Sequence, residues 1–333
     1  MAKKSLHSHS HSLREAPAQP LRVLVSWTPA TGGSEAIQLA AWLAKITPVK
    51  VRVVTTFAQP WHEVSLQKLG GKYKKWFKQE AAACEQAVEN TLVAAGIPRE
   101  YWDKHFSVLV DGPNISQMLT QSAEDFKADV VALGPGQSAP KGRFLAGSVA
   151  DTLLHYSPTP LALSPRAVKL AKNGPTRINF AFTDDHHRED FSALFDAART
   201  AALWKLPLRI LTFSANDAVN APVNDKLDVA KELTTQWREQ TMATLDVAQE
   251  EVADVFPELE ITTDIGAGRG WRAAVESLKW KKGDILFLGS TPMGALERVF
   301  IGSHATELLP HVSVPVFVSP VHKATKRQNT KKK

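Results

Sequence analysis

The sequence predicts an α/β fold of two tandem domains, each with a five-stranded parallel sheet that has helices on both faces. The first observation is an internal repeat, because residues 129–134 (DVVALG) return 155 residues later as residues 284–289 (DILFLG). The second is that short apolar runs rich in β-branched residues alternate with helical patterns, which is typical of a parallel sheet covered on both faces. The third is the length of 333 residues, which allows two domains that each bury a core.

The same offset of 155 residues holds at the front and the back of the repeated unit. It carries residues 22–28 onto 177–183, and Gly147-Ser148 onto Gly302-Ser303. One offset that fits throughout indicates the duplication of a single domain with two related sites. We therefore expect a disordered tail at 1–20, a first domain at 21–165, a linker at 166–176, a second domain at 177–320 and a basic disordered tail at 321–333.

The elements of the first unit follow from its apolar patterns. Short runs predict strands at 23–27, 49–57, 106–110, 130–133 and 161–163. Apolar residues at spacings of three and four predict helices at 35–46, 73–95, 115–126 and 148–156. Ser34 is the expected N-cap of the first helix, and Gly96 ends the second. Cys84 lies on the apolar face of the second helix, where we expect a buried thiol.

The second unit repeats this order. Its predicted strands are at 178–182, 208–213, 261–265, 285–288 and 316–318. Its predicted helices are at 190–204, 226–255, 271–280 and 303–311. The linker contains Asn173-Gly174-Pro175, which is a strong turn signal between two domains.

Charge and cysteine content narrow the class of protein. The formal charge is +6, but the last thirteen residues alone hold six basic residues and no acid, so the folded body is not basic. We therefore do not expect a nucleic-acid-binding fold. The single Cys84 excludes an intramolecular disulfide and fits a reducing compartment. The sequence also lacks an apolar run of the roughly 18–20 residues that a membrane span needs, so we expect a cytoplasmic protein.

The turn after the fourth strand of each unit is the strongest candidate for a binding site. Ligands of open parallel sheets bind beyond the carboxyl ends of the strands. In this turn a glycine at the strand end is followed, thirteen residues later, by a Gly-Ser pair that opens a helix. Glycine allows backbone N–H groups to approach a phosphate, and the serine adds a hydroxyl at the positive end of the helix dipole. The pattern predicts an anion site, with simple helix capping as the alternative.

The strand order, the duplication and this loop resemble the universal stress protein family in its tandem form, over nearly all of residues 21–320. The loop pattern of that family is G-x2-G-x9-G-[ST]. The residues that match it are Gly134, Gly147 and Ser148 in the first unit, and Gly289, Gly302 and Ser303 in the second. Gln137 and Pro292 replace the middle glycine, and Gly136 lies one position out of register.

A second departure concerns the end of the first strand. Members of the family that bind ATP usually carry an aspartate there, whereas Thr28 and Thr183 occupy that place in this chain. Asp184 directly follows Thr183 and is a possible substitute, but Thr28 is followed by Pro29. The resemblance implies a stress-response regulatory protein that binds ATP or AMP, with magnesium, at these loops. Of the two sites, the second is expected to be the better preserved.

The resemblance also implies a strand order of 3-2-1-4-5 in each domain. It further implies pairing of the last strands, 161–164 and 316–319, within the chain, and a dimer of chains. Two alternatives stay open: a scaffold of the same fold that acts through protein partners, and a weak nucleotide hydrolase. The sequence has no Walker A motif, no nucleophile elbow and no metal-ligand quartet, so we expect neither a catalytic nor a metal site.

Overall fold

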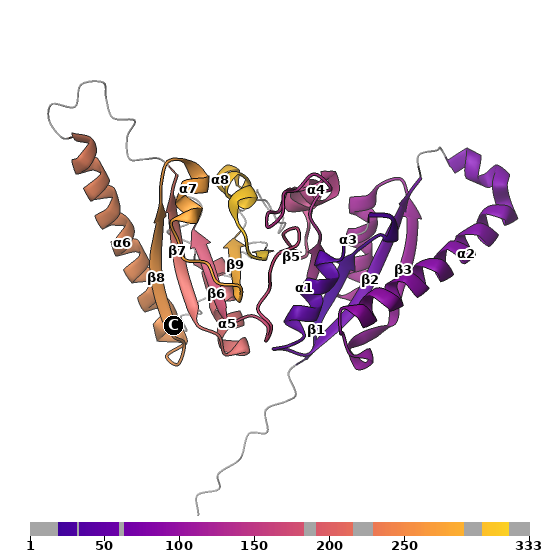
Figure 1. Cartoon of the computed structure of the whole chain (residues 1–333), viewed down its shortest axis with the longest axis horizontal. Helices are drawn as coiled ribbons and strands as arrows, with labels where there is room; N and C mark the ends of the chain where they lie inside the picture. The colour runs from indigo at the N-terminus through magenta and orange to yellow at the C-terminus, as the bar shows by residue number, and fades with distance from the viewer. Residues whose placement is uncertain are drawn as a thin grey trace, which may run out of the picture.

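The structure, a computed structural model, describes residues 19–31, 33–59, 63–182, 191–215, 229–289 and 302–319. Strands and helices alternate along both halves of the chain (Figure 1). The first half contains β1 (Leu21–Ser26), α1 (Glu35–Leu43), β2 (Val49–Ala58), α2 (Glu63–Ala94), β3 (Trp102–Gly112), α3 (Ile115–Phe126), β4 (Val130–Leu133), α4 (Ser148–Tyr156) and β5 (Leu161–Leu163). The second half contains β6 (Arg177–Phe182), α5 (Ser192–Trp204), β7 (Leu208–Ser214), α6 (Val229–Val255), β8 (Ile261–Ala267), α7 (Gly270–Glu276), β9 (Asp284–Gly289), α8 (Ser303–Leu308) and β10 (Val316–Ser319). Short 3-10 turns occur at Pro29–Thr31, Arg99–Tyr101 and Leu309–His311.

All ten strands form one sheet, in the order β3-β2-β1-β4-β5-β10-β9-β6-β7-β8. Each half therefore has the predicted order 3-2-1-4-5, counted in both halves from the outer edge of the sheet toward the β5–β10 junction. Neighbouring strands within each half are parallel, whereas β5 and β10 run antiparallel, with Ala162 opposite Phe317. The predicted pairing of the two last strands within the chain is confirmed.

Two hydrophobic cores lie on the two faces of this sheet, and each core spans both halves. One contains buried residues of α1, α2, α5 and α6, and the other contains those of α3, α4, α7 and α8. Equivalent helices of the two halves therefore cover the same face. Together with the antiparallel junction, this relates the halves by a rotation about an axis perpendicular to the sheet. The carboxyl ends of the parallel strands consequently point to opposite edges of the sheet in the two halves.

Some elements differ from their predicted bounds. Helix α2 begins ten residues earlier than predicted and includes a break at Gly70, whose φ of 46° and ψ of −118° are not helical. Helix α7 ends at Glu276, because the chain turns back and the indole N–H of Trp280 donates to the Val275 carbonyl at 2.8 Å. Ser34 occupies the N-cap position of α1 without making a capping hydrogen bond. Cys84 is buried, as expected.

The linker is fastened to both halves. The Ala171 carbonyl accepts a hydrogen bond from the indole N–H of Trp42 on α1, at 2.9 Å, and the Ala171 N–H donates to the Lys282 carbonyl at 2.9 Å. Gly174 has a φ of 96°, and a Cβ there would lie 2.9 Å from the Ile46 side chain, so the turn requires glycine.

A second contact between the halves comes from the loop that follows β4. Arg143 of this loop donates through Nη1 to the His311 carbonyl, and its Nη2 lies 2.9 Å from a carboxylate oxygen of Glu276. This arginine fixes the loop of the first half to the second half. Burial lowers the pKa of the His311 ring, and the charges of Arg143 and Arg272 act in the same direction, whereas Glu276 opposes them.

The continuous core predicts that both halves unfold together. The Phe317 and Phe287 rings stack at the junction, with centroids 5.1 Å apart and planes 12° apart. Phe317→Ala should lower the free energy of unfolding by about 3–5 kcal/mol, because it leaves a cavity in a core shared by both halves. Hydrogen exchange along a denaturant series should show β1 and β6 losing protection together. A variant in which β6 loses protection while β1 keeps that of the wild type would contradict a shared core. Val255→Ala, at an exposed site on α6, is the control.

The lowered pKa of the His311 ring predicts that the stability of the protein depends on pH. Because the folded-state pKa is lowered, the unfolded chain binds more protons as pH falls through the unfolded value of about 6.5. The contribution of the neutral His311 ring to the free energy of unfolding is therefore present above about pH 6.5 and is lost as pH falls below that value. His311→Gln should reduce the loss of unfolding free energy measured between about pH 7.5 and about pH 5.5. His105→Gln, at an exposed position on β3, is the matched control. An unchanged pH dependence in His311→Gln would show that this ring is not responsible.

Candidate functional site

The loop between β4 and α4 closes on itself through a glycine pair. The Gly136 N–H donates to the Leu145 carbonyl at 2.8 Å. A Cβ at Gly136 would lie 3.1 Å from that carbonyl oxygen and 3.2 Å from the Gly147 nitrogen, so a larger residue would push the loop apart. The close approach is thus made by Gly136, one residue before Gln137. A Cβ at Gly134 would meet no atom within 4 Å, so close packing does not explain that glycine.

The start of α4 lies at the end of this loop. Gly147 is the N-cap residue, and Ser148 is the first helical residue, with its side chain exposed. The first N–H groups of a helix have no partner within the helix and carry the positive end of its dipole. Asp151, in the first turn, already places one negative charge beside them. The hydroxyl of Ser148 and the N–H groups near it are the anion-binding elements of this turn.

Arg166 donates hydrogen bonds to the loop backbone, a role that the sequence reasoning missed. Its Nη2 donates to the carbonyls of Gly136 and Gln137, at 2.8 and 2.9 Å. Its Nε is buried and has no hydrogen-bond partner among the residues that the structure describes. The sequence analysis assigned Arg166 to the linker. Its position directly after the last strand, at the carboxyl edge of the sheet, was the available signal.

Thr28 lies at the same edge as this loop, because β1 and β4 are parallel neighbours with Val25 opposite Ala132. The turn after β1 is held by Trp27, whose carbonyl accepts from the Thr55 hydroxyl at 2.9 Å and whose indole N–H donates to the Gly33 carbonyl at 2.7 Å. The carboxylate that starts α1, on Glu35, accepts a hydrogen bond from the Ala167 N–H at 3.3 Å. Thr28 thus places a hydroxyl at this strand end, where the resemblance implies an aspartate for ATP binding.

The second unit is described only in part. Gly289 is the last residue of β9 and packs closely against α5, because a Cβ at this position would lie 2.7 Å from the Ala193 side chain. Gly302 is the N-cap residue of α8, and Ser303 is its first, exposed residue. The remaining predicted site residues of this unit lie outside the described residues: Thr183, Asp184 and Pro292.

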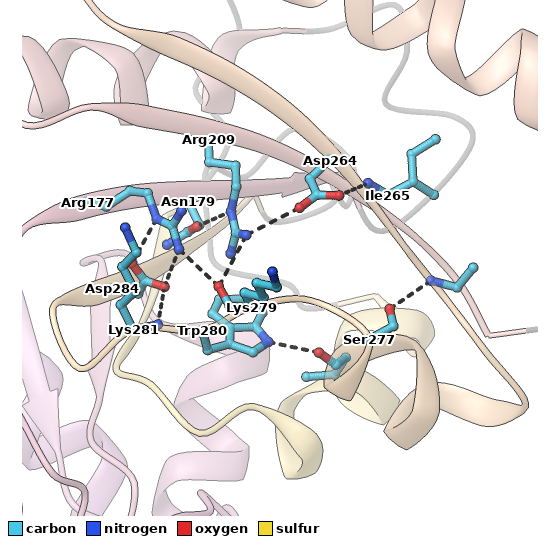
Figure 2. A network of polar contacts seen from close by, with 12 residues as sticks. Arg177, Asn179, Arg209, Asp264, Ile265, Ser277, Lys279, Trp280, Lys281 and Asp284 are labelled. Atoms are coloured by element: carbon cyan, nitrogen blue, oxygen red, sulfur yellow. Dashed lines mark hydrogen bonds and ion pairs between the residues drawn. The ribbon is translucent and has the colours of Figure 1, made fainter.

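The most strongly buried charges lie near the amino ends of the central strands of the second half (Figure 2). Arg177 forms a two-pronged ion pair with the fully buried Asp284, at 2.9 and 2.7 Å. Arg209 donates to the Asn179 side chain at 2.7 Å, and both arginines donate to the Lys279 carbonyl. Burial, together with the charge of Arg177, lowers the pKa of Arg209. This network joins the central strands of the second half to the segment that precedes β9.

A matching arginine pair stabilises the first half. The guanidinium groups of Arg22 and Arg52 lie over the Phe126 ring, at 4.2 and 4.4 Å from its centroid. Arg52 also pairs with Asp103 at 2.7 Å. Burial alone would raise the pKa of Asp103, but its hydrogen bonds from Arg52 and from backbone N–H groups, with the charge of Arg52, lower it. The two networks support the fold of each half.

The described groups at the candidate loop are suited to binding an anion. They include main-chain N–H groups, the exposed Ser148 hydroxyl and the Arg166 guanidinium. In the described part of the chain, no cluster of three or more His, Cys, Asp or Glu side chains could hold a metal ion. That part also has no helix long and apolar enough to cross a membrane.

Comparisons with known proteins agree with this architecture. Universal stress proteins of Mycobacterium tuberculosis and Mycobacterium bovis are each 28% identical to this chain over 303 residues, covering 90% of this chain and 100% of the relative. The crystal structure of a universal stress protein from Archaeoglobus fulgidus has a similar fold, with a TM-score of 0.60 and 17% identity over 91% of this chain and 99% of that one. A functionally unknown protein from Pseudomonas aeruginosa aligns with a TM-score of 0.51 and 14% identity, over 91% of this chain and 93% of that one.

The family model described as "Universal stress protein family" matches this chain twice, at residues 22–165 and 177–320. These two matches lie on either side of the β5–β10 junction of the sheet and together cover most of the chain. The chain belongs to the universal stress protein family and consists of two such domains in tandem.

Proposed function

We propose that this protein is a stress-response regulator that binds an adenine nucleotide, with the phosphates held at the loop between β4 and α4. Family membership supports the stress-response role. The observation that carries the nucleotide proposal is the folding of Gly136 onto Gly147, which places the exposed Ser148 and the first turn of α4 beside a guanidinium. Backbone N–H groups, a hydroxyl and an arginine are the donors that phosphate oxygens need.

The donor set of the first unit fits a phosphate better than it fits a base. Arg166 brings a positive charge to the loop through its hydrogen bonds to the Gly136 and Gln137 carbonyls, and this charge favours a phosphate. Gly136, Gly147 and Ser148 would hold the phosphates, and Thr28 would lie near the base. A threonine hydroxyl is uncharged and makes a weaker hydrogen bond to a base edge than a carboxylate does. The proposal therefore favours recognition of the phosphates over recognition of adenine.

A second candidate function is a scaffold that acts through protein partners without a nucleotide. The observation that favours it is that protein groups alone close the loop. Arg166 already donates to two loop carbonyls, and Gly136 to a third, so no ligand is needed to hold this shape. The negative charge of Asp151 in the first turn of α4 also weakens the attraction for an anion.

The nucleotide proposal predicts the effect of removing the serine hydroxyls. Ser148→Ala combined with Ser303→Ala should weaken the binding of ATP and AMP by about tenfold, because each variant removes a hydrogen bond to a charged oxygen. The melting temperature without ligand should stay unchanged, since both side chains are exposed and neither caps its helix. Calorimetric titration of the nucleotide-free protein, with and without magnesium, gives the affinity and the number of sites.

Thr244→Ala is the control for this experiment, because its hydroxyl bonds only within α6, to the Gln240 carbonyl at 3.0 Å. Equal affinity in the double serine variant and the control would reject the assignment of these serines to phosphate. The absence of any heat with the folded wild-type protein at high nucleotide concentration would favour the scaffold.

The loop closure by Arg166 predicts a further, local effect. Arg166→Met should raise hydrogen exchange across residues 134–147, equivalent to a loss of about 1.5–3 kcal/mol, because two hydrogen bonds from a charged donor disappear. Mass-spectrometric hydrogen exchange measures this loss peptide by peptide. Arg99→Met, which removes an exposed ion pair with Glu89, is the matched control and should change little. Unchanged exchange in the loop would show that Arg166 does not hold it closed.

A further inference from the structure

A groove lies at the boundary between the two halves. It has a volume of about 300 Å³ and is formed by the tip of the loop after β4, the linker, and the segments that precede β9 and β10 in the second half. The antiparallel junction explains its position, because it places the carboxyl edge of the first half beside the amino edge of the second. We call this feature the basic groove, after its four lysines: Lys141, Lys169, Lys281 and Lys282.

Among the residues that the structure describes, these four lysines are the only ionisable ones that line the groove. Within the described residues, none of them forms an ion pair with a carboxylate. Nearby carboxylates already have partners: Asp284 pairs with Arg177, and Glu276 pairs with Arg143 and Arg272. The Glu35 carboxylate accepts a hydrogen bond from the N–H of Ala167, which lines the groove. A concave surface lined by charges of one sign concentrates the electric field and attracts counter-ions. The groove is therefore a positively charged hollow without an internal counter-charge.

The backbone that carries these lysines is fixed on both sides. On the first-half side, the Gly142 N–H donates to the Arg166 carbonyl at 2.6 Å. On the second-half side, the Lys282 carbonyl accepts from Ala171 at 2.9 Å, and the Lys281 N–H donates to the Asp284 carboxylate at 2.8 Å. The arginine network of Figure 2 holds the same segment, because Arg177 and Arg209 both donate to the Lys279 carbonyl. Fixed attachment points reduce the cost of ordering the lysines around a ligand.

We infer that the basic groove is a binding site for a compact oligophosphate, a ligand with two or more linked phosphate groups. A groove lined by four lysines and no carboxylate favours a ligand with several negative charges, whereas a single carboxylate or orthophosphate would leave most of the positive charge uncompensated. The volume of about 300 Å³ suits a small ligand. The site differs from the proposed nucleotide site at Gly136, Gly147 and Ser148, because it shares only the tip of that loop, at Lys141, and takes Lys281 and Lys282 from the amino edge of the other half. The inference goes beyond the proposed function and stands without it.

The test is calorimetric titration of the full chain with inorganic tripolyphosphate, with orthophosphate as the comparison. Lys281→Gln combined with Lys282→Gln should weaken tripolyphosphate binding by about tenfold or more, because half of the positive charge of the groove is lost. Lys141→Gln combined with Lys169→Gln, on the other wall, should have a similar effect. The matched control is Lys74→Gln with Lys75→Gln, two neighbouring exposed lysines on α2, which should leave the affinity within about twofold. Unchanged melting temperatures show that all variants fold.

Each other outcome overturns the inference. Equal weakening in the groove variants and the α2 control would show attraction to overall charge, and no weakening in either groove pair would show that the lysines do not bind the ligand. The tripolyphosphate binding that is lost in the lysine variants should persist in Ser148→Ala, so its loss in Ser148→Ala as well would move the ligand to the loop between β4 and α4. A single-stranded oligonucleotide that binds as tightly as tripolyphosphate, at the same total charge, would contradict a compact oligophosphate. AMP separates the two proposals, because it carries a single phosphate: Ser148→Ala should weaken AMP binding, whereas the lysine variants should leave it unchanged.

Discussion

The antiparallel pairing of β5 with β10 is the constraint on which the rest of the structure depends. Each strand is short, at three and four residues, and each would otherwise be an exposed apolar edge. Paired together, they occupy the centre of a ten-stranded sheet and are almost completely buried. The pairing also merges the helical layers, so that each core runs through both halves. A duplicated domain thus becomes one folded unit through a few backbone hydrogen bonds and the apolar side chains around them.

The two halves have diverged most where they are least constrained by burial. Both halves have an arginine on their first strand, Arg22 or Arg177. In both halves the neighbouring strand carries a second arginine, Arg52 or Arg209, opposite the residue two positions further along the first strand. Buried charges of this kind must keep their partners, because removing one partner leaves the other charge uncompensated. The described loop after β4 has no fully buried ion pair and carries no such requirement. Arg166 illustrates this, since the corresponding position in the second half is Val321.

Much of the fold was predictable because it depends on periodicity and repetition. The duplication, the alternation of strands and helices, and the two end strands could be predicted from residues close together in the chain or related by one offset. The site was less predictable, because its contacts join residues that are distant in the sequence. The family pattern drew attention to Gln137, yet the close approach to Gly147 is made by Gly136, which depends on how the loop folds back. Arg166 reaches loop carbonyls 29 and 30 residues away, which no local pattern reveals. Helix α7 ends early for a similar reason, since the Trp280 side chain returns to Val275.

The geometry of the junction also determines how the two proposed ligand sites would influence each other. The loop between β4 and α4 begins at the proposed nucleotide site, contributes Lys141 to the basic groove and is fastened to the second half by Arg143. A ligand changes a conformational equilibrium only if it binds one state of this loop more tightly than another. If nucleotide binding moves Lys141 relative to Lys281, it must alter oligophosphate affinity, and oligophosphate must then alter nucleotide affinity by the same factor. If the loop stays rigid, held by Arg166 on one side and Arg143 on the other, the two affinities are independent. The hydrogen bonds of these two arginines therefore determine whether the tandem arrangement couples two signals or only brings them together in one chain.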